Sequence, residues 1–127
     1  MSFTIFPVLY RDADNYKAGR DFAFQGAITS VQKDALRSAL SDEAYFVPTQ
    51  VGLEHLGADL ASFPGNADHG FHELDVDAIT VVESITEYAQ MQEEPLEDFL
   101  ARFNTIGTNG WNPTVACDAL GIPQEIY

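Results

Sequence analysis

The sequence is short of cysteine. Its 127 residues include one, Cys117, which excludes an internal disulfide and, by itself, a zinc site built from several thiolates. A chain of this length should bury about two thirds of its unfolded surface, so it needs no disulfide or metal for stability. We therefore expect one domain over residues 1–127, in a reducing, cytoplasmic environment.

Long hydrophobic runs are also missing. No segment approaches the roughly 20 apolar residues that cross a bilayer. The apolar run from Phe3 to Tyr10 is interrupted by Pro7 and has no basic region before it. The sequence thus predicts no membrane helix, no signal peptide and no binding to a membrane.

Basic residues are scarce. Six lysine and arginine residues stand against 20 acidic ones, which gives a net charge of −14. This charge repels phosphate and argues against direct binding of DNA, RNA or anionic lipid. Three interpretations stay open: the acidity keeps the protein soluble, it suits a salt-rich cytoplasm, or it mimics DNA or attracts a basic protein partner.

Familiar catalytic and ligand-binding motifs are missing as well. The chain has no GxSxG or HExxH motif, and its GTNG segment, residues 107–110, lacks the ending of a phosphate-binding loop. The DADNYK segment opens like a calcium loop, but Lys17 replaces the required glycine and Ala23 the final glutamate. Cys117 has no protease signature around it. These patterns argue against serine hydrolase, P-loop, calcium-loop and cysteine protease chemistry.

Apolar, aromatic and β-branched segments predict about four strands. They cover residues 3–10, 20–26, 44–47 and 71–76, and residues 79–82 extend or pair with the last one. Pro7 cannot donate to a ladder, so the first strand should be an edge strand or contain a bulge. Residues 84–94 have a mixed pattern that favours no element.

Helix signals mark three segments. Thr29 and Gln32 form a capping box before a helix over residues 30–40. Pro95 opens a second helix that should stop at Gly107, and Asn112 caps a third, short helix that ends near residue 121. A further short helix is expected within residues 51–60. The predicted fold is a single α+β domain: a mostly antiparallel sheet of about four strands, with about three helices packed chiefly on one face.

All three histidines lie between residues 55 and 72. His69 and His72, with the carboxylates of Asp68 and Glu73 and with His55 from a neighbouring element, could bind a divalent cation such as zinc. Residues three apart on a strand point to opposite faces, so this site requires a turn between the two histidines. The alternative is that they are hydrogen-bonded histidines at the margin of the core.

Several aromatic residues could line a pocket or an interaction patch, although core packing is their default role. They are Tyr45, Phe46, Phe63 and Trp111.

Three strings, YRDADNYK at residues 10–17, FVPTQVGL at 46–53 and FHELD at 71–75, resemble segments of small uncharacterised bacterial proteins. The resemblance implies no activity. Because no reactive constellation is complete, we expect a non-enzymatic cytoplasmic protein that binds another macromolecule, most simply a protein. The alternatives are a small metal-binding protein or metal-dependent hydrolase that uses the histidine cluster, and a DNA-mimic inhibitor.

Overall fold

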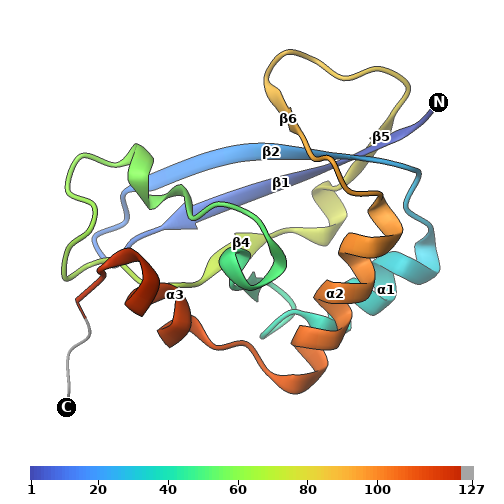
Figure 1. Ribbon diagram of the computed structural model, residues 1–127. Helices are drawn as coiled ribbons and strands as arrows, with labels where there is room; N and C mark the ends of the chain where they lie inside the picture. Colours follow the sequence, from blue (N-terminus) through green and yellow to red (C-terminus); the bar gives the residue numbers. More distant parts are fainter. Residues whose placement is uncertain (124–127) are drawn as a thin grey trace.

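Within residues 1–123, the fold combines three α-helices with one six-stranded sheet (Figure 1). The computed structural model describes residues 1–123; residues 124–127, which the expected domain includes, lie outside the described part. The strands are β1 (Phe3–Arg11), β2 (Lys17–Gln25), β3 (Tyr45–Phe46), β4 (His72–Leu74), β5 (Thr80–Val82) and β6 (Ala89–Met91). The helices are α1 (Ser30–Ala39), α2 (Leu96–Asn109) and α3 (Pro113–Leu120), with the short 3₁₀ helices η1 (Pro48–Val51), η2 (Leu56–Asp59) and η3 (Val76–Ala78). The predicted α+β class is therefore confirmed.

The sheet is mixed and larger than expected. Its order is β3-β4-β1-β2-β6, and β5 also pairs with β1. β2, β4 and β5 run antiparallel to β1, and β3 runs antiparallel to β4, whereas β6 is parallel to β2. The sheet therefore has more strands than the predicted four, and it is mixed because β6 pairs in parallel. β6 arises from the segment with a mixed pattern, and β5 makes its own pairing with β1 instead of extending β4.

β1 is the central strand, so the edge position expected from Pro7 is wrong. On one side, β2 pairs with β1 along its whole length. On the other side, β5 pairs with residues 3–5 and β4 pairs with residues 8 and 9. The 3₁₀ helix η3 interrupts the chain between these two strands, and Pro7 lies at the interruption. A proline in a central strand is tolerated there because the ladder on that side is already broken.

The hairpin of β1 and β2 is closed by a short polar turn. The carboxylate of Asp12 accepts hydrogen bonds from the amides of Asp14 and Tyr16, both at 2.9 Å. Asn15 occupies the left-handed region with φ of 68°. Asp and Asn are favoured at such positions because their side chains replace backbone partners and tolerate this conformation.

The two faces of the sheet differ in burial. Along β1 the even-numbered residues 4–10 are buried and the odd-numbered residues 3–9 are partly exposed, which is the two-residue period of a strand. The buried face packs on α2, where the ring centroid of Phe99 lies 5.5 Å from Phe6 and 4.3 Å from Phe24. Figure 1 shows α1, α2 and α3 on this side of the sheet.

Two of the expected helix starts are confirmed. At α1 the hydroxyl of Thr29 accepts from the amide of Gln32, and the Gln32 side chain accepts from the amide of Thr29. At α3 the side chain of Asn112 accepts from the amide of Thr114 at 3.1 Å. Among residues 1–123, no helix is long and apolar enough to cross a membrane.

The predicted end of α2 at Gly107 is wrong, because the helix continues to Asn109. Gly107 is instead a contact residue. A Cβ atom at this position would lie 2.4 Å from the carbonyl oxygen of Ala39 in α1. The glycine therefore lets α2 approach α1 closely, and the sequence signal for a helix end reflects packing.

The helix expected within residues 51–60 is also absent. Two 3₁₀ helices occupy this region, and Gly52 ends the first of them with φ of 85°. The ring of His55 caps the second one by accepting from the amide of Gly57 at 2.9 Å. This irregular segment lies against β2 and brings His55 onto the buried face of the sheet.

Candidate functional site

The face of the sheet turned away from the helices is the candidate site, and we call it the open face. Leu9 of β1 lies opposite Glu73 of β4, and Glu73 lies opposite Tyr45 of β3, so these three side chains share one side. Strand pairing places further residues on the same side: Phe3, Ile5, Pro7, Arg11, Asp21, Val82 and Met91.

An apolar stripe runs along the middle of the open face. Its residues are Phe3, Ile5, Pro7 and Leu9, all partly exposed. The connection from β5 to β6 arches on this side of the sheet (Figure 1), but no helix within residues 1–123 packs on the stripe. An exposed apolar patch with a polar rim is typical of an interaction site.

Residues of this face line two hollows. The first, which we call the Arg11 pocket, has a volume of about 710 Å³ and is lined by Arg11, Ser41, Asp42, Tyr45, His69, Phe71 and Glu73. The second has a volume of about 430 Å³ and is lined by Pro7, Val8, Leu9, Gly19, Arg20, Asp21 and Tyr88. Both volumes fall in or near the range of ligand pockets, about 300–1,000 Å³.

Negative charge surrounds the open face. The guanidinium of Arg11 is held by Glu73, with 3.1 Å between Nε and Oε2. The exposed carboxylates of Asp21, Asp42 and Glu87 form no ion pair with a basic side chain of residues 1–123. A binding partner with positive charge would therefore find uncompensated acids here.

Directly behind the Arg11 pocket, three histidines surround the buried ring of Tyr10. The ring centroid of Tyr10 lies 4.6 Å from that of His55, 5.2 Å from His69 and 4.7 Å from His72. The Tyr10 hydroxyl donates to Asp68 at 2.5 Å and accepts from the amide of His69 at 3.2 Å. The structure thus brings together four of the five predicted metal ligands, and leaves Glu73 on the open face.

Both ring nitrogens of His55 and of His69 are directed at the backbone. His55 accepts from the amide of Gly57 at Nδ1, so its proton lies on Nε2, which donates to the carbonyl oxygen of His69 at 2.6 Å. His69 accepts from the amide of Phe71 at Nδ1 and donates from Nε2 to the carbonyl oxygen of Arg11 at 2.8 Å. A zinc ligand would need the lone pairs that these amides occupy.

His72 is paired with the backbone at one ring nitrogen. Its Nε2 accepts from the amide of Leu56 at 2.9 Å, which places the proton of the neutral ring on Nδ1, and this buried Nδ1 has no hydrogen-bond partner within residues 1–123. Both carboxylate oxygens of Asp68 are also engaged, by Tyr10 and by the amide of Gly65. Within residues 1–123, no group of three or more His, Cys, Asp or Glu side chains is arranged to hold a metal ion. Zinc binding by the five residues stays a prediction.

Burial controls protonation in this cluster. Desolvation, aided by the neighbouring His55, lowers the pKa of His72 to about 3. Desolvation also lowers the pKa of His55, against the opposing pull of the His69 carbonyl and Asp68. The pKa of the Tyr10 hydroxyl is raised by burial and by its hydrogen bond to Asp68. Around neutral pH the two imidazoles and the phenol are therefore uncharged.

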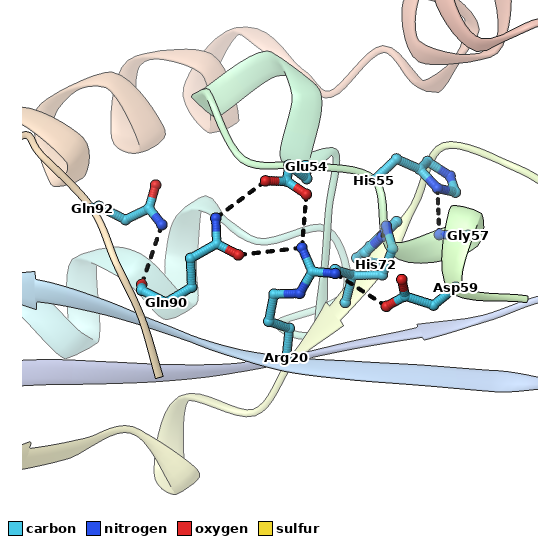
Figure 2. A network of polar contacts seen from close by, with 9 residues as sticks. Arg20, Glu54, His55, Gly57, Asp59, His72, Gln90 and Gln92 are labelled. Carbon is cyan, nitrogen blue, oxygen red and sulfur yellow. Dashed lines mark hydrogen bonds and ion pairs between the residues drawn. The ribbon is translucent and has the colours of Figure 1, made fainter. Parts of the chain in front are cut away.

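A second polar network anchors the segment that carries His55. Figure 2 shows Arg20 reaching from β2 to Glu54 and Asp59, at 2.7 and 3.1 Å. Gln90 of β6 donates to Glu54 at 3.1 Å. The hydrogen bond from Gln90, followed by the one from Arg20, lowers the pKa of Glu54. The network ties β2, β6 and the 54–59 segment together.

The aromatic residues proposed for a pocket have different positions. Tyr45 reaches the open face and is 40 % exposed. Phe46 is buried, Trp111 donates to the carbonyl oxygen of Ala39 at 2.8 Å, and Phe63 packs against His55. Cys117 is buried, and burial raises the pKa of its thiol, so it lacks the thiolate character of a nucleophile.

Sequence reasoning missed the open face itself. Arg11, Asp42 and Phe71 meet there only because strands far apart in the chain are paired. One local signal pointed to it: the FTIFPVLY segment is apolar at odd as well as even positions, although only one of its faces is covered.

Comparisons with protein-family models, with curated proteins and with solved structures found no match for this chain.

Proposed function

We propose that this protein is a non-enzymatic cytoplasmic binding protein whose open face receives a basic protein partner. The observation that carries the proposal is the partly exposed apolar stripe of Phe3, Ile5, Pro7 and Leu9, which no helix of residues 1–123 covers. An apolar centre with a polar rim is the usual anatomy of a protein interface.

The charge distribution supports a basic partner. The net charge is −14, and each of the four arginines already has a carboxylate partner within the chain. The acids that surround the stripe are therefore available to an external cation. Long-range attraction of this kind increases the association rate and disfavours acidic partners.

The experiment is capture from a cell lysate with three baits: the wild type, Leu9→Glu on the open face and Val31→Glu on α1. Val31 is 78 % exposed and lies on the helical side, so Val31→Glu adds the same charge far from the stripe. We expect the wild type and Val31→Glu to retain the same basic protein and Leu9→Glu to lose it. The purified partner should then bind directly.

Two results would contradict the proposal. One is equal recovery of the partner by all three baits, which would locate binding elsewhere. The other is turnover of a substrate by the purified protein without any partner. Circular dichroism of the three baits checks that each variant is folded.

DNA mimicry remains an alternative of the same kind. A mimic occupies the DNA site of its target, so duplex DNA would compete with the protein for the captured partner. A partner whose binding is insensitive to duplex DNA would eliminate this alternative.

The metal-dependent alternative is favoured by one observation, the convergence of His55, His69 and His72 around Tyr10. It requires these rings to release their backbone amide partners. Stoichiometric zinc after purification, with a higher melting temperature on zinc addition, would support it. An unchanged melting temperature on zinc addition, together with no bound metal, would exclude the metal-dependent alternative.

A further inference from the structure

The Arg11 pocket combines aromatic walls with carboxylates. Tyr45 and Phe71 supply the rings, and Glu73 and Asp42 supply the negative charge. A guanidinium group both stacks on aromatic faces and forms paired hydrogen bonds with carboxylates. The composition of the pocket therefore fits a guanidinium better than an anion or an apolar group.

The pocket already holds one such pair. Arg11 donates from Nε to Glu73 at 3.1 Å and from Nη1 to Asn15 at 2.9 Å. The Arg11 and Glu73 side chains are 42 % and 31 % exposed, so solvent screens the pair and a competing cation can displace it. The Arg11–Glu73 pair thus shows that a guanidinium group can bind a carboxylate in this pocket.

The turn that carries Asp42 is held in an unusual conformation. Asp42 and Glu43 have φ of 51° and 60°, in the left-handed region that side-chain-bearing residues rarely adopt. Paired backbone hydrogen bonds between Ser41 and Tyr45, at 2.8 and 2.9 Å, close this turn. It keeps Asp42 at the pocket together with Tyr45, the residue that ends the turn.

We infer that the Arg11 pocket binds an arginine side chain of the protein partner. This inference rests on the proposed function, because it supplies the anchor for a basic partner on the open face. The incoming guanidinium stacks between Tyr45 and Phe71, pairs with Asp42 and competes with Arg11 for Glu73. Lysine fits less well, since its compact, strongly hydrated ammonium stacks weakly and cannot form the planar two-bond contact.

The test is a titration of the whole ¹⁵N-labelled protein with two short peptides, followed by amide chemical shifts. One peptide holds two arginines among glycines, and the other holds two lysines in the same places. We expect the arginine peptide to bind about five- to tenfold more tightly and to shift the amides of residues 41–45 and 69–73. Equal binding of the two peptides, or shifts spread over the whole surface, would overturn the inference.

Variants sharpen the titration. Glu73→Gln and Asp42→Asn should each lower the affinity for the arginine peptide about tenfold, because each removes a charged hydrogen-bond acceptor. Asparagine tolerates the left-handed region, so Asp42→Asn retains the turn even if Glu73→Gln perturbs β4. Glu87→Gln, on the β5–β6 connection, makes the same charge change outside the pocket and should leave affinity within about twofold. An equal loss in all three variants would show general charge attraction and refute the pocket.

Arg11→Gln gives an opposite expectation. Without Arg11 to compete for Glu73, the affinity for the arginine peptide should increase about threefold. A lower affinity would show that Arg11 does not compete with the peptide. The outcomes also separate the two proposals. If the arginine peptide does not bind selectively while partner capture still depends on Leu9, only the pocket inference is refuted. If the arginine peptide binds selectively but capture of the partner does not depend on Leu9, the proposed function is refuted.

Discussion

At the scale of single residues, the three histidines around Tyr10 act as hydrogen-bonding groups for the backbone. Each ring accepts a hydrogen bond from one backbone amide. His55 accepts from Gly57, His69 from Phe71 and His72 from Leu56. The irregular chain between η1 and β4 has few ladder partners, and a buried amide without an acceptor is costly. The imidazoles satisfy these amides while filling apolar space around Tyr10.

This role predicts a loss of stability in mild acid. The folded state lowers the pKa of His72 to about 3, whereas an unfolded histidine titrates near 6.5. Below about pH 6.5 the unfolded chain binds the proton and the folded chain does not, so stability falls continuously as the pH drops toward 3. Between pH 7.5 and 5.0 the free energy of unfolding should decrease by about 2 kcal/mol from this residue. Urea denaturation at the two pH values measures it.

The control is His72→Gln, which can still accept from the amide of Leu56 but does not titrate. Its stability should depend less on pH than that of the wild type over the same interval. His55, whose pKa is also lowered, accounts for part of the remaining slope, and Asp68 and His69 face the same cluster. An identical slope in both proteins would mean that His72 is not buried in its neutral form.

Tyr10→Phe tests the centre of the cluster. The substitution removes the donor to Asp68 and the acceptor for the His69 amide, while the ring stays in place. Leaving buried polar groups without partners should destabilise the protein by about 1–3 kcal/mol. Tyr16→Phe, at a site that is 63 % exposed, should change stability by less than about 0.5 kcal/mol. Equal effects in urea denaturation would refute a structural role for the hydroxyl.

The sequence was informative about which residues gather here, but not about their role. Three histidines within 18 residues indicated a cluster, and four of the five named residues do meet. The direction of each ring nitrogen depends on the backbone of η2 and of the turn before β4. No local pattern encodes that geometry, so the sequence left both metal binding and core packing open.

At the scale of elements, Gly107→Ala tests the contact between α1 and α2. Alanine normally favours a helix interior by about 1 kcal/mol over glycine. Here its Cβ would lie 2.4 Å from the carbonyl oxygen of Ala39, so the helices must separate. We expect a net destabilisation of about 1–3 kcal/mol. Thr105→Ala, at an exposed position of the same helix, should be neutral or stabilising, and a more stable Gly107→Ala protein would contradict the close contact.

Local signals predicted the elements whose ends are determined locally. The capping box of Thr29 and Gln32 and the cap at Asn112 depend on neighbours within three residues, and both are present. β6 could not be found this way, since its three residues become a strand only by pairing with β2. The edge position predicted from Pro7 was wrong for the same reason. A proline fits the central strand here because β4 and β5 leave a break in the ladder beside it.

At the scale of the whole molecule, the net charge of −14 predicts that salt stabilises the protein. Compact folding brings like charges together, and added ions screen their repulsion. Raising sodium chloride from about 20 to about 500 mM should increase the melting temperature by about 2–5 °C. Potassium chloride should act equally, because the effect is not ion-specific. A decrease in melting temperature would show that the arginine–carboxylate pairs outweigh the general repulsion.

The central claim is that the open face of the sheet binds a basic protein. The most direct measurement is the dissociation constant of the captured partner, determined by calorimetry for the wild type, Leu9→Glu and Val31→Glu. We predict that Leu9→Glu weakens binding at least about tenfold, because it places a charge in the apolar centre of the interface, while Val31→Glu stays within about twofold. Equal dissociation constants for all three proteins would contradict the account.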